Sequence, residues 1–174
     1  MRDLLTALNV VLGGLEEDLI PDERPGDTKF FDYHLLPVAE WGNSMEVARR
    51  ALVDARRYWT GEERFLDVGC GIGSKLRLAS AIGWKVSGIE RWEPYANVAR
   101  RAGFDVQTVE ASDYLSYFDF DLVYMYRLCV DIEAEEELVR LIVDRMAPGT
   151  LLFHAGGPDP TYLDHVGEHV WWVG

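Results

Sequence analysis

Short apolar runs alternate with segments of helical periodicity through most of the chain. The runs that fit buried strands are Arg64–Val68, Lys85–Ile89, Phe104–Val109, Phe120–Tyr126 and Thr150–His154. Between them, apolar residues recur every three or four positions in segments that begin at Lys75, Pro94 and Glu133, as they do on one face of a helix. Strands that alternate with helices predict an α/β fold, with a doubly wound, mostly parallel sheet and helices on both faces.

The two ends of the chain depart from this alternation. Residues 1–61 are predicted to form an N-terminal helical or lid segment, and residues 62–174 the α/β core. A helix is expected over Met45–Trp59, with Asn43 and Glu46 as its capping box. The C-terminus is predicted to be shortened, with one last strand over Val170–Val173. The apolar pair Trp171 and Trp172 would then need cover, so a homodimer is possible.

The stretch "FLDVGCGIGSKL" places three glycines directly after the first predicted strand. Gly69, Gly71 and Gly73 allow positive φ and close approach of a ligand to the backbone. The spacing G-x-G-x-G departs from the dinucleotide fingerprint G-x-G-x-x-G, which disfavours a nicotinamide oxidoreductase. Asp67 precedes the loop, and an acid at this point suits a ligand with a cationic amine better than a pyrophosphate. Asp67 is otherwise a buried acid that caps the loop.

Further polar residues follow the second and third predicted strands. Glu90 can accept two hydrogen bonds from a ribose diol, and Trp92 can stack on a purine. Glu110 and Asp113 offer acceptors for an adenine amino group. The alternatives are an ordinary exposed acid at Glu90 and a simple packing role for Trp92.

The segments "FLDVGCGIG", "VSGIERW", "VEASDY" and "FDLVYMYRL" together resemble the class I S-adenosylmethionine-dependent methyltransferases. The resemblance covers about residues 62–155 and implies S-adenosylmethionine as the cofactor. The N-P-P-Y or D-P-P-Y motif of DNA amino-methylating enzymes is missing, which disfavours that role.

The resemblance also implies a role for each matching residue. Asp67, Gly69 and Gly71 would line the methionine and ribose parts of the cofactor, with Gly73 in the same loop. Glu90 would hold the ribose hydroxyls. Arg91 or Trp92 would cover the adenine, and Glu110 or Asp113 would meet its amino group. Tyr126 and Arg127 would face the methyl group and the acceptor.

Composition and charge narrow the partners. The chain has 174 residues, 48% of them hydrophobic, and a formal net charge of −13. Such a surface repels phosphate, which makes nucleic acid an unlikely partner, although Arg49, Arg50, Arg56 and Arg57 form a local basic cluster or a solvated helix face. Two cysteines and no apolar run long enough to span a bilayer predict a cytoplasmic protein without a membrane anchor.

No metal site is expected. Glu133, Glu135, Glu136 and Glu137 are interpreted as acids near the positive end of a helix. His154 is either a base or a structural histidine. The predicted function is methyl transfer from S-adenosylmethionine to an unidentified acceptor, either a small molecule or a protein. The alternative is a binding module of the same fold that holds the cofactor or a partner without catalysis.

Overall fold

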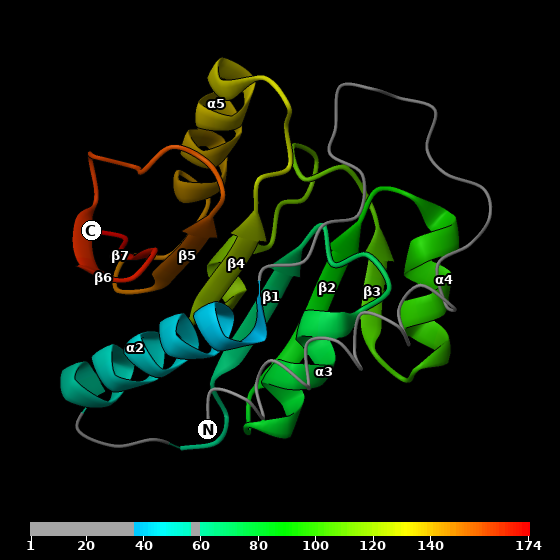
Figure 1. Ribbon diagram of the computed structural model, residues 1–174, viewed down its shortest axis with the longest axis horizontal. Coiled ribbons are helices and arrows are strands. Elements are labelled where there is room, and N and C mark those ends of the chain that lie inside the picture. The colour runs from blue at the N-terminus through cyan, green and yellow to red at the C-terminus, as the bar shows by residue number, and fades with distance from the viewer. Residues whose placement is uncertain (1–36, 57–59) are drawn as a thin grey trace.

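A sheet with parallel strands at its centre organises the protein. A computed structural model describes residues 37–56 and 60–174. Its strands are β1 (Arg64–Val68), β2 (Lys85–Glu90), β3 (Asp105–Thr108), β4 (Leu122–Tyr126), β5 (Leu151–Ala155), β6 (Asp164–Gly167) and β7 (Val170–Trp172). They form one seven-stranded sheet in the order β3-β2-β1-β4-β5-β7-β6 (Figure 1).

The strand directions confirm the predicted doubly wound α/β fold. β1 pairs in parallel with both β2 and β4, β2 with β3, and β4 with β5. Chain order therefore reverses at β1, where the sheet extends to β2 on one side and to β4 on the other. The carboxyl ends of these strands share one edge of the sheet, and ligands of open α/β sheets bind at such a switch point.

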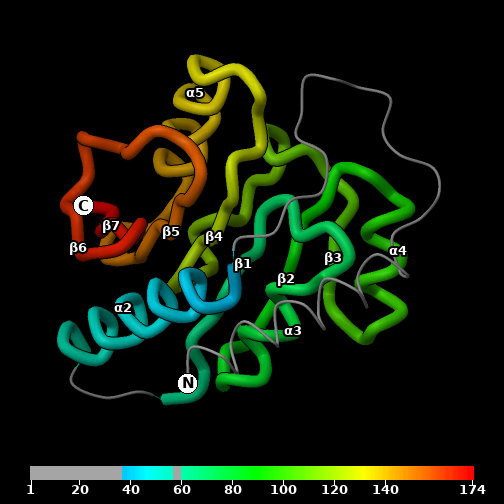
Figure 2. Tube along the Cα trace, viewed as in Figure 1, coloured from blue at the N-terminus to red at the C-terminus, as the bar shows by residue number. Residues whose placement is uncertain are grey.

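Helices cover both faces of the sheet. One face carries α2 (Val38–Arg56), α3 (Ser74–Ala81) and α4 (Glu93–Arg101), and the other carries α5 (Ile132–Val143) and the short 3₁₀ helix η1 (Tyr117–Asp119). Figure 2 shows these layers along the Cα trace. Across residues 37–56 and 60–174, no helix combines the length and the apolar character that crossing a bilayer requires.

Helix α2 begins earlier than the sequence pattern predicted. The carbonyl of Pro37 accepts the N–H of Trp41 at 2.9 Å, so the helix starts before Asn43 and Glu46, and the predicted capping box is wrong. The apolar stripe explains the earlier start, because it extends back from Met45 to Trp41, which is 3% exposed. The far end of the predicted helix, residues 57–59, lies outside the described residues.

The arginines of α2 pair with acids of the chain itself. Arg49 and Arg50 both contact Glu46, and Arg56 contacts Asp121. The described part of the predicted basic cluster is thus a helix face with internal ion pairs. Arg57 lies outside the described residues.

The C-terminus forms a hairpin, where the sequence predicted a single strand. β7 pairs antiparallel with β5 on one side and with β6 on the other. Glu168 and His169 make the turn with positive φ values of 37° and 64°. β6 escaped prediction because its exposed residues lack the apolar alternation of a half-buried strand.

The hairpin also covers Trp171 and Trp172, whose expected exposure was the reason to consider a homodimer. Val170 and Trp171 are 0% and 3% exposed, and Trp172 packs partly buried against the core. The chain therefore covers this apolar pair by itself. The expected shortening lies between β5 and β6, where the described chain contains no helix.

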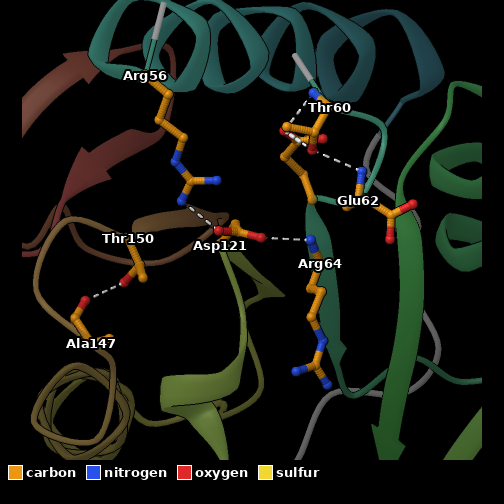
Figure 3. Close-up of polar contacts among 8 residues, drawn as sticks. Arg56, Thr60, Glu62, Arg64, Asp121, Ala147 and Thr150 are labelled. Atoms are coloured by element: carbon orange, nitrogen blue, oxygen red, sulfur yellow. Dashed lines mark hydrogen bonds and ion pairs between the residues drawn. The ribbon is translucent and has the colours of Figure 1, made fainter. Parts of the chain in front are cut away.

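Asp121, the residue before β4, connects α2 to the beginnings of β1 and β5. Its carboxylate accepts the backbone N–H of Arg64 at 2.7 Å and pairs with the guanidinium of Arg56 (Figure 3). Its backbone carbonyl accepts the N–H of Leu151, the first residue of β5. One residue thus contacts α2, β1 and β5 at the edge of the sheet opposite the glycine loop.

We predict that Asp121→Ala lowers the free energy of unfolding by about 1 kcal/mol, because the N–H of Arg64 and the guanidinium of Arg56 both lose an acceptor. Urea unfolding followed by tryptophan fluorescence measures this change. The matched control is Asp119→Ala, whose exposed ion pair with Arg64 spans 3.8 Å and should contribute less than about 0.5 kcal/mol. Equal effects of the two substitutions would contradict the role of Asp121.

Candidate active site

The glycine loop after β1 forms backbone hydrogen bonds with the end of β2. Gly69, Gly71 and Gly73 have φ values of 73°, 54° and 84°, which side-chain-bearing residues rarely adopt. The N–H groups of Gly69 and Cys70 both donate to the carbonyl of Ile89, at 2.9 and 3.0 Å. The loop therefore sits at the carboxyl edge of the sheet, where the sequence placed it.

At two of the three glycines, neighbouring atoms leave no room for a side chain. A Cβ atom at Gly69 would lie 2.5 Å from Cδ2 of Leu128, in the loop after β4. A Cβ atom at Gly73 would lie 3.1 Å from the Cβ of Ala99 on α4 and 3.2 Å from the ring of Phe104. These contacts explain Gly69 and Gly73 through packing, independently of a ligand.

Glu90 joins the end of β2 to the glycine loop. Its carboxylate accepts the N–H of Gly71 and the N–H of Trp92, each at 2.9 Å. The side chain is buried, at 7% exposure, and burial raises its pKa while the two backbone hydrogen bonds oppose that rise. The sequence-based alternative of an ordinary exposed acid at Glu90 is therefore wrong.

A second buried acid, Asp67, faces a buried lysine that sequence reasoning missed. Burial raises the pKa of Asp67 to about 8, while the nearby Lys75 ammonium lowers it and the charge of Glu90 raises it further. Lys75 is only 6% exposed, and its Nζ lies 5.6 Å from the ring centre of Trp41. The only signal in the sequence was a lysine in the first turn after the glycine loop, which is indistinguishable from a solvated helix residue.

The residues after β2 and β3 converge only in part. Arg91 lies 3.7 Å from the carboxylate of Glu110, so the structure brings these two candidates together. The Trp92 ring packs edge-on against Tyr95, with ring centres 4.4 Å apart. Asp113 is exposed in the turn that follows, where its N–H donates to the carbonyl of Glu110.

Tyr126 and Arg127 lie at the carboxyl end of β4, beside the loop after β5. A Cβ atom at Gly156 would lie 2.8 Å from the Tyr126 ring, so that ring packs directly on the glycine backbone. Arg127 has a positive φ of 30°, which is strained for this residue type, and its N–H donates to the carbonyl of Ala155 at 3.0 Å. Its guanidinium donates to the carbonyl of Val130 at 3.3 Å.

Neither cysteine suits nucleophilic catalysis. Burial raises the pKa of Cys70 well above its ordinary value, and burial together with the charge of Glu135 raises the pKa of Cys129 to about 11. Both side chains are therefore thiols at neutral pH, whereas the thiolate is the reactive form. Within residues 37–56 and 60–174, no three His, Cys, Asp or Glu side chains are placed to hold a metal ion.

Comparison with known proteins identifies the family. A family model described as "Methyltransferase domain" matches residues 41–173. The chain belongs to this methyltransferase family. The match includes most of α2, the whole sheet and every candidate residue described above.

Solved methyltransferase structures share the fold. The sugar N-methyltransferase KedS8 from a Streptoalloteichus species is 22% identical, with a TM-score of 0.51 over 83% of this chain and 64% of that one. The plantazolicin methyltransferase BpumL, solved with S-adenosylhomocysteine, is 15% identical, with a TM-score of 0.49 over 67% and 48%. An RNA methyltransferase from Salinibacter ruber, solved with the same ligand, is 19% identical, with a TM-score of 0.48 over 63% and 73%.

No curated protein matches this methyltransferase in sequence. The chain also spans less than two thirds of the length of KedS8 and about half of that of BpumL.

The cofactor of this methyltransferase is S-adenosylmethionine, and the residues at the carboxyl edge fit it. A carboxylate has about four acceptor positions, so Glu90 keeps capacity for ligand hydroxyls after its two backbone bonds. Asp67 is a buried acid beside the loop, and a cationic ligand group there would favour its charged form.

The raised pKa of Asp67 predicts a pH effect on stability. Its folded pKa of about 8 lies above its ordinary value of 3.8, so between these values the folded state holds one proton that the unfolded state has released. Stability from this group therefore falls as pH rises through that range, with a slope that approaches about 1.4 kcal/mol per pH unit.

Asp67→Asn removes this titrating group. As the pH rises from 5 to 8, the variant should therefore lose less stability than the wild type. Urea unfolding of both proteins across that range gives the difference. Parallel stability curves would contradict the raised pKa.

Proposed function

We propose that this methyltransferase transfers the methyl group of S-adenosylmethionine to a small-molecule or protein acceptor. The observation that carries the proposal is the buried carboxylate of Glu90, which bonds to the glycine loop and keeps unused acceptor positions at the carboxyl edge. The candidate cofactor residues follow β1, β2 and β3, whose carboxyl ends share this edge.

Each candidate residue has a proposed role. Glu90 binds the ribose hydroxyls, and Asp67 with the backbone of Gly69 and Gly71 lines the methionine and ribose parts. Gly73 keeps α3 close to α4, so that the start of α3 stays beside the loop. Arg91 or Trp92 covers the adenine, and Glu110 or Asp113 accepts from its amino group.

Catalysis by this chain is chiefly alignment. Bound S-adenosylmethionine supplies a methyl group that is already activated by its sulfonium charge. Tyr126 and Arg127 orient the acceptor beside the glycine loop, and the packed ring of Tyr126 excludes water from that side. A proton acceptor is required only where the acceptor atom carries a proton that it must lose.

Charge favours an acceptor other than nucleic acid. The net charge of −13 opposes a polyphosphate backbone, and the described arginines of α2 are paired with acids. The likeness to a sugar N-methyltransferase is compatible with a small-molecule acceptor. A guanidinium at Arg127 would suit an acceptor with a carboxylate or a phosphate group.

We predict that the wild-type protein binds S-adenosylhomocysteine and that Glu90→Ala weakens binding by about 1 to 3 kcal/mol, the cost of leaving buried polar partners unpaired. Isothermal calorimetry measures both affinities. Asp105→Asn is the matched control, because Asp105 is an exposed acid at the opposite end of the neighbouring strand. Unchanged affinity in the Glu90 variant would remove the ribose assignment.

The rate of methyl transfer to the acceptor should depend on Tyr126 and Arg127. We expect Tyr126→Phe or Arg127→Ala to lower kcat/KM for an acceptor found by screening for S-adenosylhomocysteine release, with cofactor affinity almost unchanged. If both variants keep their kcat/KM, the acceptor site lies elsewhere. If the wild type binds cofactor but no acceptor from amine, hydroxyl and carboxylate libraries is methylated, the binding-module alternative is favoured.

A further inference from the structure

A buried carboxylate, Glu135, lies in the first turn of α5, beneath the loop that follows β4. It is 1% exposed and accepts three hydrogen bonds. The donors are the N–H of Leu128 at 3.2 Å, the N–H of Cys129 at 2.7 Å and Nε2 of His154 at 2.9 Å. Glu135 therefore joins α5 both to the β4–α5 loop and to β5.

Ordinary helix electrostatics do not account for this burial. The N–H of Ala134 in the first turn has no partner within the helix, and it donates to the side chain of Asp131 at 2.9 Å. The acids on either side, Glu133 and Glu136, are exposed, as expected for residues that only favour the positive helix end. A buried carboxylate is costly without partners, so its three donors point to a role in holding the loop.

His154 donates to the Glu135 carboxylate through one ring nitrogen, while its other ring nitrogen is buried. It is 1% exposed, and its Nδ1 is buried with no hydrogen-bond partner among residues 37–56 and 60–174. The ring also requires a glycine beside it, because a Cβ atom at Gly157 would lie 2.6 Å from Cε1 and Nε2. A histidine placed this way provides a third donor for Glu135. Its burial separates it from a methyl acceptor, so it is a structural histidine in this account.

The loop that Glu135 holds contacts the glycine loop directly. Leu128 extends to within 2.5 Å of a Cβ position at Gly69, so its side chain fills the space beside that glycine. Arg127, the preceding residue, keeps its strained φ of 30° while the N–H groups of the next two residues are bonded to Glu135. The carboxylate thus acts on the candidate acceptor residues and on the glycine loop through one short backbone segment.

From these contacts we infer that Glu135, supported by His154, is a positioning residue that couples the acceptor loop (residues 126–129) to the cofactor loop (residues 69–73). This inference rests on the proposed function, because it assumes that the glycine loop binds the cofactor. Glu135 itself does not touch the reacting atoms. It fixes Leu128 against Gly69 and thereby the backbone that a ligand meets.

The test compares Glu135→Gln with Glu136→Gln, an exposed neighbour that loses the same charge. Gln keeps the size of the side chain but cannot accept at both of its terminal atoms. We expect Glu135→Gln to weaken S-adenosylhomocysteine binding about tenfold, or roughly 1.4 kcal/mol, and Glu136→Gln to leave it unchanged. Calorimetry gives the affinities, and urea unfolding shows whether stability alone has changed.

A double-mutant cycle with Leu128→Ala separates coupling from general destabilisation. If Glu135 acts through Leu128, the double variant should bind S-adenosylhomocysteine no more weakly than the weaker single variant. Additive losses, or wild-type affinity in a less stable Glu135→Gln protein, would overturn the inference and leave Glu135 a structural residue. A wild type that does not bind would instead contradict the proposed function.

The unmodified protein offers a second readout should Glu135→Gln not fold. Amide hydrogen exchange is measured on the wild-type chain with and without S-adenosylhomocysteine. We expect the ligand to slow exchange at Leu128 and Cys129, while the amides of β6 at the far edge of the sheet stay unchanged. Unchanged exchange at both loop amides in the presence of bound ligand would also overturn the inference.

Discussion

The burial of carboxylates at one edge of a parallel sheet is the constraint on which the site depends. Asp67, Glu90 and Glu135 are all buried, and each lies beside a loop at the carboxyl ends of the strands. Desolvation of such groups opposes folding, so each needs donors or a cation nearby. Backbone N–H groups supply the donors for Glu90 and Glu135, and Lys75 supplies the nearby cation for Asp67.

The backbone partners of Glu90 and Glu135 come from the loops that are proposed to bind the cofactor and the acceptor, which would link folding to function. The N–H of Gly71 can reach Glu90 only because the glycine loop folds back over the end of β2. The N–H of Cys129 reaches Glu135 only because the chain turns sharply after β4, through the strained Arg127. The compensation of the buried charges therefore orders both the cofactor loop and the acceptor loop.

The opposite edge of the sheet has a different task. There Asp121 joins α2 to β1 and β5, with an ion pair and a bond to a backbone N–H (Figure 3). Most of the buried charged side chains lie at the carboxyl edge, whereas at this edge only Glu63 is a buried acid among the described residues, and Asp121 connects the layers. Such a division is expected where a rigid scaffold carries functional loops.

The sequence was sufficient for the central strands and the glycine loop, because strand burial and glycine punctuation are local signals. It was insufficient where the decisive neighbour is distant along the chain. Glu135 was interpreted as a helix-end acid because nothing within its own helix indicates His154 or Cys129. Lys75 has the same explanation, since its burial depends on Trp41 and Asp67.

The start of α2 and the strand β6 were missed for local reasons. In α2, an N-x-x-E pattern that matches a capping box lies inside a helix whose apolar stripe begins earlier, at Trp41. β6 is a polar strand at the sheet edge, and it is specified by its pairing with β7 and not by its own hydrophobicity.

The central claim is that one edge of the sheet binds the methyl donor through the loops after β1, β2 and β4. The most direct measurement is a titration of isotope-labelled protein with S-adenosylhomocysteine, followed by backbone amide chemical shifts. The account predicts large shifts at residues 69–73, 90–92 and 126–129, and almost none at Asp121 or in β6. Shifts confined to the opposite edge, or none at saturating ligand, would contradict it.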